Sequence, residues 1–327
     1  MYNFKTKTPS FYDDNYVPQS KSIMSQDVDL NNPQDIYRFI KQNVYKQDEY
    51  CKLAAMFLYN HARGIRSRMV VAGPPGSGKS LVSECIKALW PNTIIVNAAT
   101  LTMQGFVGNN KVDSCLKRIN TAETNYILVY DEFDKIVRPR RSASENVSDN
   151  IQAEFLKMVE GETIDVGEKG ESHLIDTSKM SFIFCGSFAV KANEIAEKNS
   201  YKTMGFNAEE HVEKAFAKEL TMDDIIDFGL IPEIASRCTN LANVRPLTLK
   251  DYEYLLTEHP ASPLRKIEDE YQVKIHITKK KLKQIAREAY NSQLGVRYAY
   301  AKLRRMVDAE IFNSYEKSDD EMAFINL

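Results

Sequence analysis

The sequence predicts an α/β fold, in which a parallel sheet covered on both faces by helices forms a large domain and a smaller, mostly helical domain follows. Two observations predict it. Short segments that are apolar at every position alternate with helical segments through most of the chain, as in buried parallel sheets. From about Leu247 the strand signals fade and helices dominate. We therefore expect an extended tail over residues 1–30, a large domain over 31–245 and a helical domain over 246–327.

The large domain is predicted to begin with two helices. The residues before them are polar and lack helical periodicity, which favours an extended tail. Pro33 is typical of a first helical position and opens the first helix. The second helix covers about residues 47–61, and we expect Leu53, Met56 and Phe57 on its buried face.

Four strands are predicted in the large domain, each a short apolar run. The four strands cover residues 69–72, 94–96, 126–130 and 181–185. Between the strands we expect helices at about 81–89, 112–119 and 151–159. A polar loop leads into the helix at 151–159.

The segment GPPGSGKS, residues 73–80, matches the pattern G-x-x-x-x-G-K-[ST]. Its glycines let backbone N–H groups surround phosphate oxygens, and the helix that begins near Lys79 points its positive end at the same anion. Lys79 is expected to reach the β- and γ-phosphates, and the Ser80 hydroxyl to bind Mg²⁺. The segment lies between a strand and a helix, so we prefer an ATP site to a plain Gly/Pro turn. Nucleotide contacts are expected from Pro75, Gly76, Ser77, Gly78, Lys79, Ser80 and Leu81.

Two carboxylates, Asp131 and Glu132, follow the strand at 126–130. Ligands of open α/β sheets bind at the carboxyl ends of the strands, where these side chains are expected. Asp131 would hold Mg²⁺, and Glu132 would act as the general base that activates water. The alternative is a solvated acidic turn. Together with the phosphate loop, the pair favours ATP hydrolysis over nucleotide binding alone.

Composition excludes several classes of protein. The net charge of -2 and the pI of about 6.3 argue against a whole-protein affinity for nucleic acid. The longest apolar runs have the length of strands, so we expect no membrane span. Five scattered cysteines, none in a C-x-x-C pair, argue against a zinc module. The first residues lack an apolar signal segment, and we therefore expect a reduced, cytoplasmic protein.

With these motifs placed, the sequence resembles the AAA+ superfamily and, within it, the ClpX unfoldases. The related unfoldase HslU shares several of the matching segments but lacks an insertion like the one between Phe188 and Leu230. The resemblance covers about residues 33–312. It is carried by NVYKQDEYCKLAAMFLYNH, GPPGSGKSL, LTMQGFVG, YDEFDKI, IDTSKMSFIFCGSF, DDIIDFGLIPEIASR and LGVR. It implies an AAA+ P-loop NTPase fold and a homo-hexameric ring that couples ATP hydrolysis to the unfolding of protein substrates.

The resemblance assigns roles to four further residues. Val44 and Tyr45 would line the adenine pocket. Arg237, in PEIASR, would be the arginine finger that reaches the nucleotide of the neighbouring subunit, and Arg297, in LGVR, the sensor arginine of the small domain. A cation beside the γ-phosphate stabilises charge that develops in phosphoryl transfer. The alternative for each arginine is a surface salt bridge.

Two loops are also implied. The first, Gly105, Phe106, Val107 and Gly108, would be the pore loop that grips polypeptide, with Phe where the family usually has Tyr. A hydrophobic turn packed in the core is the alternative. The second, Met204, Gly205 and Phe206, stands where the family has an Ile-Gly-Phe loop that docks into the peptidase ClpP. Whether a ClpP-type peptidase docks here is left open.

The chain departs from the family in two places. We expect it to lack the N-terminal zinc-binding domain. The family also has a basic loop at the pore entrance, which reads degradation tags ending in a carboxylate. The matching stretch here, residues 161–176, contains five acidic residues and one lysine. We therefore expect substrate choice to differ from that of ClpX.

Two other functions stay open at this point. The first is an ATP-driven motor or loader for nucleic acid, which net charge and the aromatic pore loop disfavour. The basic run at 138–141 lies in a polar loop, and the run at 279–281 is the polar start of a helix predicted over 279–290. The second is a non-catalytic scaffold, which the presence of Glu132, Arg237 and Arg297 disfavours.

Overall fold

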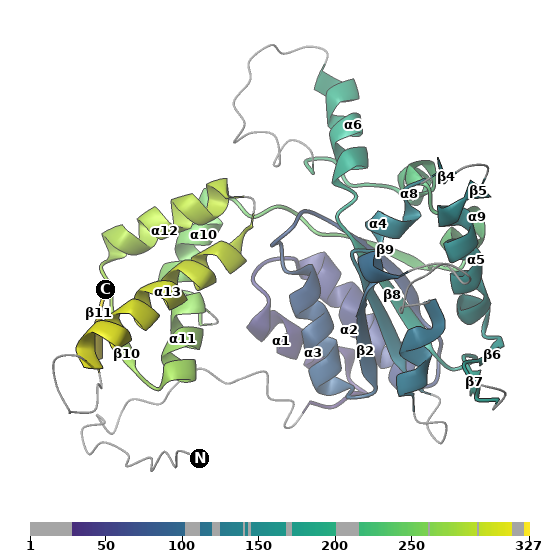
Figure 1. Cartoon of the computed structure of the whole chain (residues 1–327), viewed down its shortest axis with the longest axis horizontal. Helices are drawn as coiled ribbons and strands as arrows, with labels where there is room; N and C mark the ends of the chain where they lie inside the picture. The colour runs from purple at the N-terminus through teal and green to yellow at the C-terminus, as the bar shows by residue number, and fades with distance from the viewer. Residues whose placement is uncertain are drawn as a thin grey trace. The chain divides into compact units, whose positions relative to one another are not determined.

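A computed structural model of the chain describes residues 28–101, 112–119, 125–139, 141–142, 145–167, 172–200, 216–260, 262–292, 294–315 and 324–327. Most of the predicted N-terminal tail lies outside these ranges. The described residues form two compact units, a larger one that ends at Pro246 and a smaller one over Leu247–Leu327. Figure 1 shows the larger unit as a sheet with helices on both faces and the smaller one as a group of helices.

The larger unit is built on five parallel strands in the order β2-β3-β8-β1-β9. The inner strands β1, β3 and β8 are almost wholly buried, which explains their continuous apolar sequences. All five carboxyl ends meet at one edge of the sheet because the strands are parallel. The strands are β1 (Arg68–Ala72), β2 (Thr93–Asn97), β3 (Ile127–Asp131), β8 (Ser181–Gly186) and β9 (Asn240–Asn243).

Four of these strands confirm the predictions, and β9 was missed. Its sequence, NLAN, contains no apolar run, and only Ala242 is buried. A strand at the edge of a sheet needs fewer apolar side chains, because one of its sides has no neighbouring strand. The pairing with β1, from Met69 opposite Asn240 to Ala72 opposite Asn243, defines β9 instead.

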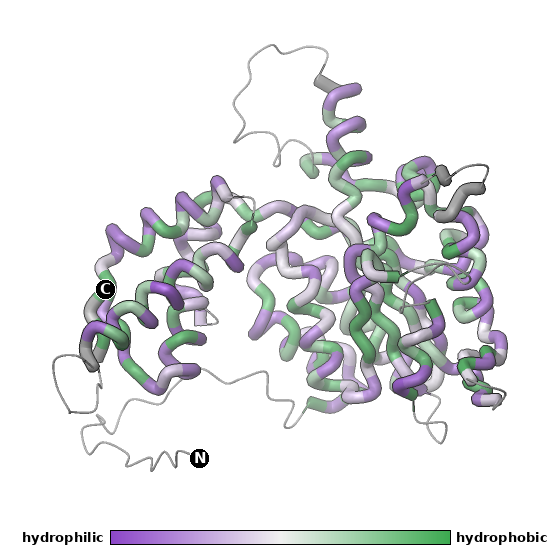
Figure 2. The backbone as a smooth tube through the Cα atoms, viewed as in Figure 1, coloured by the Kyte–Doolittle hydropathy of each residue, from purple (hydrophilic) through white to green (hydrophobic). Residues whose placement is uncertain are grey.

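Helices cover both faces of this sheet. Figure 1 shows α1 (Pro33–Asn43), α2 (Asp48–Ala62) and α3 (Lys79–Leu89) on one face and α5 (Val147–Glu160) on the other. Helix α1 begins at Pro33 as predicted, with the Asn32 side chain accepting a hydrogen bond from the Gln34 N–H at 3.0 Å. Along the tube in Figure 2, the strands are green and the outer faces of the helices are mostly purple.

The predicted buried face of α2 was partly wrong. Phe57 is buried as predicted, Leu53 is half-buried and Met56 is 43% exposed. The other buried residues of the helix include Cys51, Ala54 and Leu58. A helix at the surface of a domain buries one face, and the face that packs here includes Ala54 and Leu58, which leaves Met56 exposed. A second difference lies at Val112–Arg118, which forms a 3₁₀-helix, η2, rather than an α-helix.

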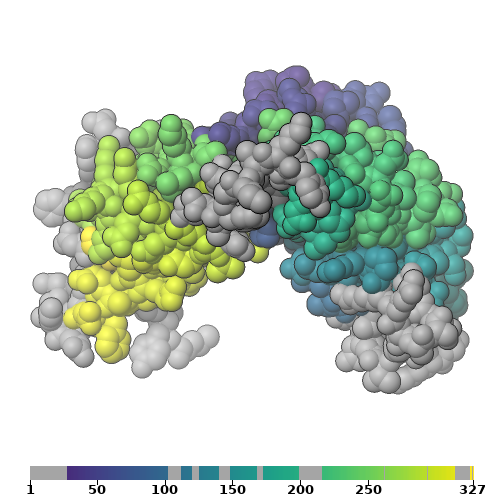
Figure 3. Space-filling model, turned by 90° about the horizontal axis from the view of Figure 1, so that it is seen from above, coloured from purple at the N-terminus to yellow at the C-terminus, as the bar shows by residue number. Residues whose placement is uncertain are grey.

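Most of the other elements of the larger unit are short. Helix α5 begins at Val147, four residues before the predicted start. Figure 3 shows that segments after β8, coloured teal and green, make up much of the face of the larger unit seen in that view. The remaining elements are η1 (Ala98–Thr100), α4 (Asp134–Val137), β4 (Arg141–Ser142), β5 (Glu145–Asn146), β6 (Thr163–Asp165), β7 (Leu174–Asp176), α6 (Ala189–Ser200), α8 (Met222–Phe228) and α9 (Pro232–Ala235).

Aromatic side chains pack the core behind the carboxyl end of β3. The Tyr130 and Phe155 rings meet edge to face at 4.6 Å, and the Phe133 and Phe184 rings lie 4.5 Å apart. All four are fully buried. Such pairs contribute about 0.5–1.5 kcal/mol each beyond the burial of their surface. The core therefore anchors the chain on both sides of Asp131 and Glu132.

The cysteines belong to this buried interior. All five are free thiols with little or no exposed surface. Burial raises the pKa of Cys185, on β8, to about 12, so that this thiol stays protonated. Within the described ranges, each helix is too short or too polar to cross a membrane.

The smaller unit packs four helices around a core that includes Leu256, Ile285 and Leu303. The predicted helix over 279–290 is confirmed as α12, and Lys279, Lys280 and Lys281 are exposed in its first turn. A two-stranded parallel pair, β10 and β11, completes this unit. The elements are α10 (Leu249–Thr257), α11 (Pro263–Tyr271), β10 (Lys274–His276), α12 (Lys279–Asn291), α13 (Val296–Tyr315) and β11 (Phe324–Asn326).

Candidate functional site

The loop between β1 and α3 has the backbone of a phosphate cradle. Gly76 and Gly78 have φ values of 71° and 99°, a conformation that L side chains rarely adopt. Gly78 is the N-cap of α3 and offers no side-chain hydrogen bond to the first turn. The start of a helix presents N–H groups and the positive end of the helix dipole, and both favour the binding of an anion in this loop.

Lys79 is folded back into this loop. Its Nζ donates hydrogen bonds to the carbonyls of Gly73 at 2.5 Å and Pro74 at 2.7 Å, and its side chain is almost buried. The Ser77 hydroxyl also donates to the Pro74 carbonyl, at 2.7 Å. A buried ammonium group held by carbonyl oxygens lies ready to exchange those partners for a stronger acceptor such as a phosphate oxygen. At the rim of the loop, Pro75 and Leu81 are exposed.

Ser80 and Asp131 lie in contact. The Ser80 hydroxyl, in the first turn of α3, donates to Asp131 Oδ2 at 2.9 Å at the end of β3. A hydroxyl and a carboxylate are hard oxygen ligands of the kind that Mg²⁺ prefers. This pair at the mouth of the phosphate cradle fits a magnesium ion.

Glu132 follows in a strained conformation. Its φ of 57° lies in the left-handed region, which costs a non-glycine residue about 1 kcal/mol or more. Hydrogen bonds from two backbone N–H groups hold this turn, one to a side chain and one to a carbonyl. The Glu132 N–H donates to Asp131 Oδ1 at 2.9 Å, and the Phe133 N–H donates to the Cys185 carbonyl at 2.7 Å. The Glu132 side chain is exposed, so its carboxylate is accessible to water.

The residues expected at the adenine lie beside the same loop. Val44 is 2% exposed, and its Cγ1 atom is 3.8 Å from the position that a Cβ atom would take at Gly78. Tyr45 is half-buried. Lys46 follows with a positive φ of 56°, and its carbonyl accepts a hydrogen bond from Lys41 Nζ at 2.7 Å, which fixes the turn between α1 and α2.

Sequence reasoning gave no role to Gln47, the next residue. Its side chain is buried and donates a hydrogen bond to the Ser77 carbonyl in the phosphate loop at 3.3 Å. No local signal points to this contact, since the two residues are 30 positions apart and a glutamine before a helix is unremarkable. The contact makes Gln47 part of the wall of the site.

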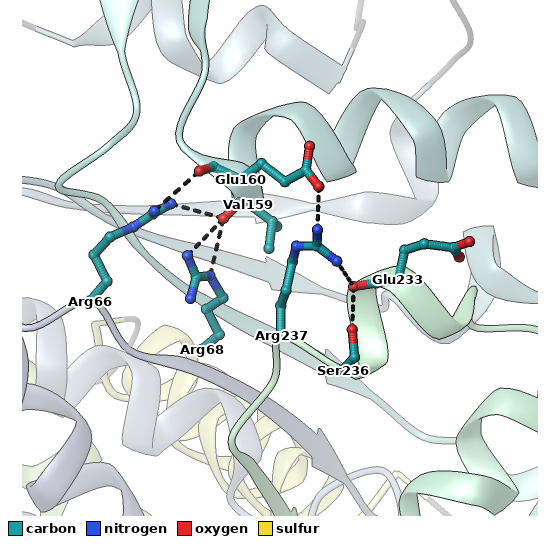
Figure 4. A network of polar contacts seen from close by, with 7 residues as sticks. All are labelled: Arg66, Arg68, Val159, Glu160, Glu233, Ser236 and Arg237. Carbon is teal, nitrogen blue, oxygen red and sulfur yellow. Dashed lines mark hydrogen bonds and ion pairs between the residues drawn. The ribbon is translucent and has the colours of Figure 1, made fainter.

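Arg237 lies elsewhere in the larger unit, just after α9 (Figure 4). One of its terminal nitrogens donates to the Glu233 carbonyl at 2.6 Å, and the other forms an ion pair with the Glu160 carboxylate. Both side chains of this ion pair are about one third exposed, at 34% and 35%. Arg237 therefore has an acidic partner within its own chain and is still accessible from outside.

Two more arginines converge on the same helix end (Figure 4). Arg66 donates to the Val159 carbonyl at 2.8 Å, and both Arg68 Nε and Nη2 donate to it, at 3.1 and 2.8 Å. Cations stabilise the last turn of a helix, which is the negative end of its dipole. Desolvation lowers the pKa of Arg68, and the charges of Arg66 and Arg237 lower it further. The C-terminus of α5 thus carries a cluster of three guanidinium groups.

The other predicted residues are spread over several parts of the chain. Arg297 is the second residue of α13, in the smaller unit, and is exposed. The predicted pore loop, Gly105, Phe106, Val107 and Gly108, lies outside the described residues. So does the predicted peptidase-docking segment of Met204, Gly205 and Phe206.

The acidic stretch of residues 161–176 contains a β-hairpin. Strands β6 and β7 pair in antiparallel fashion, with Thr163 opposite Asp176 and Asp165 opposite Leu174. Asp165 accepts hydrogen bonds from the Ser172 hydroxyl at 2.7 Å and from two backbone N–H groups at 2.9 Å. These bonds lower its pKa, the Ser172 bond most, and hydrogen bonds from Ser178 lower the pKa of Asp176. Both carboxylates therefore stay charged at neutral pH.

Comparison with known proteins finds an ATPase family and proteins named as ATP-binding subunits. Residues 69–196 match the family described as "ATPase family associated with various cellular activities (AAA)". The chain is 28% identical over 330 residues to "ATP-dependent Clp protease ATP-binding subunit ClpX" of Treponema denticola, which covers 87% of this chain and 78% of that protein. It is 27% identical over 311 residues to the protein of the same name from Porphyromonas gingivalis, which covers 82% and 74%.

Proposed function

We propose that this chain, an AAA+ ATPase similar to ClpX, works as a ring of six copies that unfolds proteins and threads them through its centre. One observation carries the enzymatic half of the proposal: the phosphate loop, the Ser80–Asp131 pair and the exposed Glu132 lie together at one edge of the sheet. The similarity to ClpX over 87% of the chain supports the mechanical half.

In this proposal the chain binds ATP through its P-loop. The N–H groups at the start of α3 hold the phosphates, and Lys79 exchanges the carbonyls of Gly73 and Pro74 for phosphate oxygens. Val44 and Tyr45 line the adenine pocket. Ser80 and Asp131 would hold Mg²⁺, which neutralises charge on the phosphates.

Glu132 takes the proton of the attacking water. General-base catalysis of this kind contributes about 10²–10⁴-fold to a rate. The turn at Asp131–Phe133 fixes the backbone position from which the Glu132 side chain extends, because hydrogen bonds from two backbone N–H groups and the aromatic core hold it. The strained φ of Glu132 supports this reading, since strained backbone is concentrated at functional sites.

Arg237 completes the site of a neighbouring copy. For this role its guanidinium group exchanges Glu160 for the γ-phosphate held by that copy. An arginine finger contributes about 10³–10⁵-fold to phosphoryl transfer. A residue that acts only on a neighbour requires a closed assembly, which supports the ring. Arg297 acts as the sensor arginine from the smaller unit.

Protein substrates are gripped by the loop of Gly105, Phe106, Val107 and Gly108. Phe106 and Val107 offer apolar contact that depends little on substrate sequence. The segment of Met204, Gly205 and Phe206 docks into a ClpP-type peptidase. The acidic hairpin β6–β7 lies at the entrance and selects against tags that end in a carboxylate.

The test uses purified protein, ATP and a folded fluorescent protein that carries an unstructured extension. We expect ATP-dependent loss of fluorescence with the wild-type chain and none with Glu132→Gln. Addition of a ClpP-type peptidase should convert unfolding into degradation if the docking segment works. ATPase activity that needs DNA, falls steeply with salt and never unfolds the test protein would overturn the proposal in favour of a nucleic-acid motor.

A further inference from the structure

The segment that follows β9 is packed directly against the start of the phosphate loop. The Val244 N–H donates to the Ala72 carbonyl at 2.7 Å. A Cβ atom on Gly73 would lie only 2.4 Å from the Val244 carbonyl oxygen and 2.6 Å from its Cβ. The backbones at Gly73 and Val244 therefore touch, and neither can move far without displacing the other.

Gln47 ties the same segment to the far side of the loop. Its Oε1 accepts a hydrogen bond from the Arg245 N–H at 3.0 Å, and its Nε2 donates to the Arg245 carbonyl at 2.8 Å. The same Nε2 donates to the Ser77 carbonyl at 3.3 Å. The partners fix the orientation of the amide, since a rotated group would place its oxygen against two carbonyls.

These contacts join the phosphate loop to the segment Val244–Arg245 at two points. The loop is braced at Gly73 through direct packing and at Ser77 through Gln47. Phosphate binding would draw Lys79 away from the Gly73 and Pro74 carbonyls. Gly73 is the residue of the first brace, and Pro74 is joined to Ser77, the residue of the second, by the Ser77 hydroxyl, which donates to the Pro74 carbonyl at 2.7 Å. Arg245 is two residues before Leu247, where the smaller unit begins.

We propose that Gln47 is a positioning residue that transmits the nucleotide state of the phosphate loop to the segment leading into the smaller unit. It does so by holding Ser77 and Arg245 on a single carboxamide. This inference rests on the ATPase activity, and for its mechanical consequence on the proposed function. It assigns no chemical step to Gln47.

The experiment compares Gln47→Leu with Gln152→Leu. Gln152 is a matched control, because its buried carboxamide also bonds backbone on both sides, donating to the Gly229 carbonyl and accepting from the Ile231 N–H, each at 2.9 Å. Neither of these partners belongs to the phosphate loop. Each full-length variant is studied with and without a slowly hydrolysed ATP analogue. Binding affinity, thermal unfolding and hydrogen exchange of the α10 amides are measured.

We expect both variants to lose stability, because each removes comparable hydrogen bonds. Gln47→Leu should bind the analogue at most about tenfold more weakly, the effect of one to two average hydrogen bonds. The change in α10 exchange caused by the analogue should fall by about half or more in Gln47→Leu and persist in Gln152→Leu.

A full nucleotide-dependent change in Gln47→Leu, or none in the wild type, would overturn the inference. If Gln47→Leu does not fold, Gln47→Met replaces it, since its unbranched side chain is close to that of glutamine in shape and offers no donor to the Ser77 and Arg245 carbonyls. The readouts use no protein substrate, so they separate a failure of this inference from a failure of the unfolding function.

Discussion

Ser80 and Asp131 are joined by a hydrogen bond of 2.9 Å between the first turn of α3 and the end of β3. The contact spans 51 positions of sequence and joins the two halves of the proposed ATP site. It exists because β1 and β3 are parallel strands that flank β8, so that whatever follows each strand emerges at the same edge. The predictions on hydrolysis depend on this arrangement.

The first prediction concerns the general base. Glu132→Gln should keep ATP binding but slow turnover by about 10²-fold or more, because the amide cannot accept the proton of water. Lys79→Ala should instead weaken nucleotide binding itself. Steady-state hydrolysis and equilibrium binding check both, with Glu84→Gln on the exposed side of α3 as control. Turnover of Glu132→Gln within about twofold of wild type would remove Glu132 as the base.

The second prediction concerns the ring. If Arg237 acts on a neighbour, wild type mixed with an excess of Arg237→Ala should lose ATPase activity faster than linear dilution predicts. Lys280→Ala, an exposed change in the smaller unit, serves as the control in the same mixing series. A linear loss, or a monomer in light scattering with ATP present, counts against an action between subunits.

The third prediction concerns the pore loop. Phe106→Ala removes most of the proposed apolar grip and leaves the nucleotide site unchanged. ATP hydrolysis should persist while unfolding of the fluorescent test protein collapses. Phe106→Tyr keeps an aromatic side chain and should unfold the test protein as wild type does, because an added hydroxyl leaves the van der Waals contacts of the aromatic group in place. Unfolding that survives Phe106→Ala would show that another element grips the substrate.

The fourth prediction concerns tag recognition. Asp165 and Asp176 stay charged at neutral pH, since hydrogen bonds lower the pKa of both. A tag with a free carboxylate would meet a like-charged entrance, with repulsion acting over about 8 Å at physiological salt. Peptides that differ only in a free or amidated C-terminus should therefore compete unequally, and the amidated peptide should bind better. Stronger binding of the free carboxylate would show that the hairpin does not act as an acidic entrance.

The fifth prediction concerns stability at low pH. Burial lowers the pKa of His61 to about 4, while its Nδ1 lies 2.8 Å from the Ser181 hydroxyl. The pKa of His61 in the folded state is below its unfolded value of about 6.5. The folded protein therefore has its full stability above about pH 6.5, where His61 is neutral in both states. Stability is lost as the pH falls from 6.5 toward 4, because the unfolded chain binds a proton at His61 before the folded one does. Between about pH 7 and pH 5 the loss should be about 2 kcal/mol.

The measurement is the free energy of unfolding of wild type and His61→Asn across this pH range. The carboxylates are common to both proteins, so the difference between the two curves isolates His61. Parallel curves would show that His61 is not buried in its neutral form.

Sequence by itself determined whatever is encoded in neighbouring residues. The phosphate loop at 73–80 is contiguous, so its glycines, Lys79 and Ser80 could be identified without coordinates. The same holds for the apolar strand that ends in Asp131 and Glu132. These patterns also predicted four of the five strands of the sheet, since a buried parallel strand must be apolar throughout.

Only the tertiary structure decided which distant residues meet. The Arg237–Glu160 ion pair spans 77 positions and the Gln47–Arg245 pair spans 198, and neither has a local signal. β9 exists because it pairs with β1, and Met56 is exposed because the opposite face of α2, which includes Ala54 and Leu58, is the one that packs inward. The physical reason is common to these cases: burial and pairing depend on what packs against a segment, and periodicity within the segment carries no information about its neighbours.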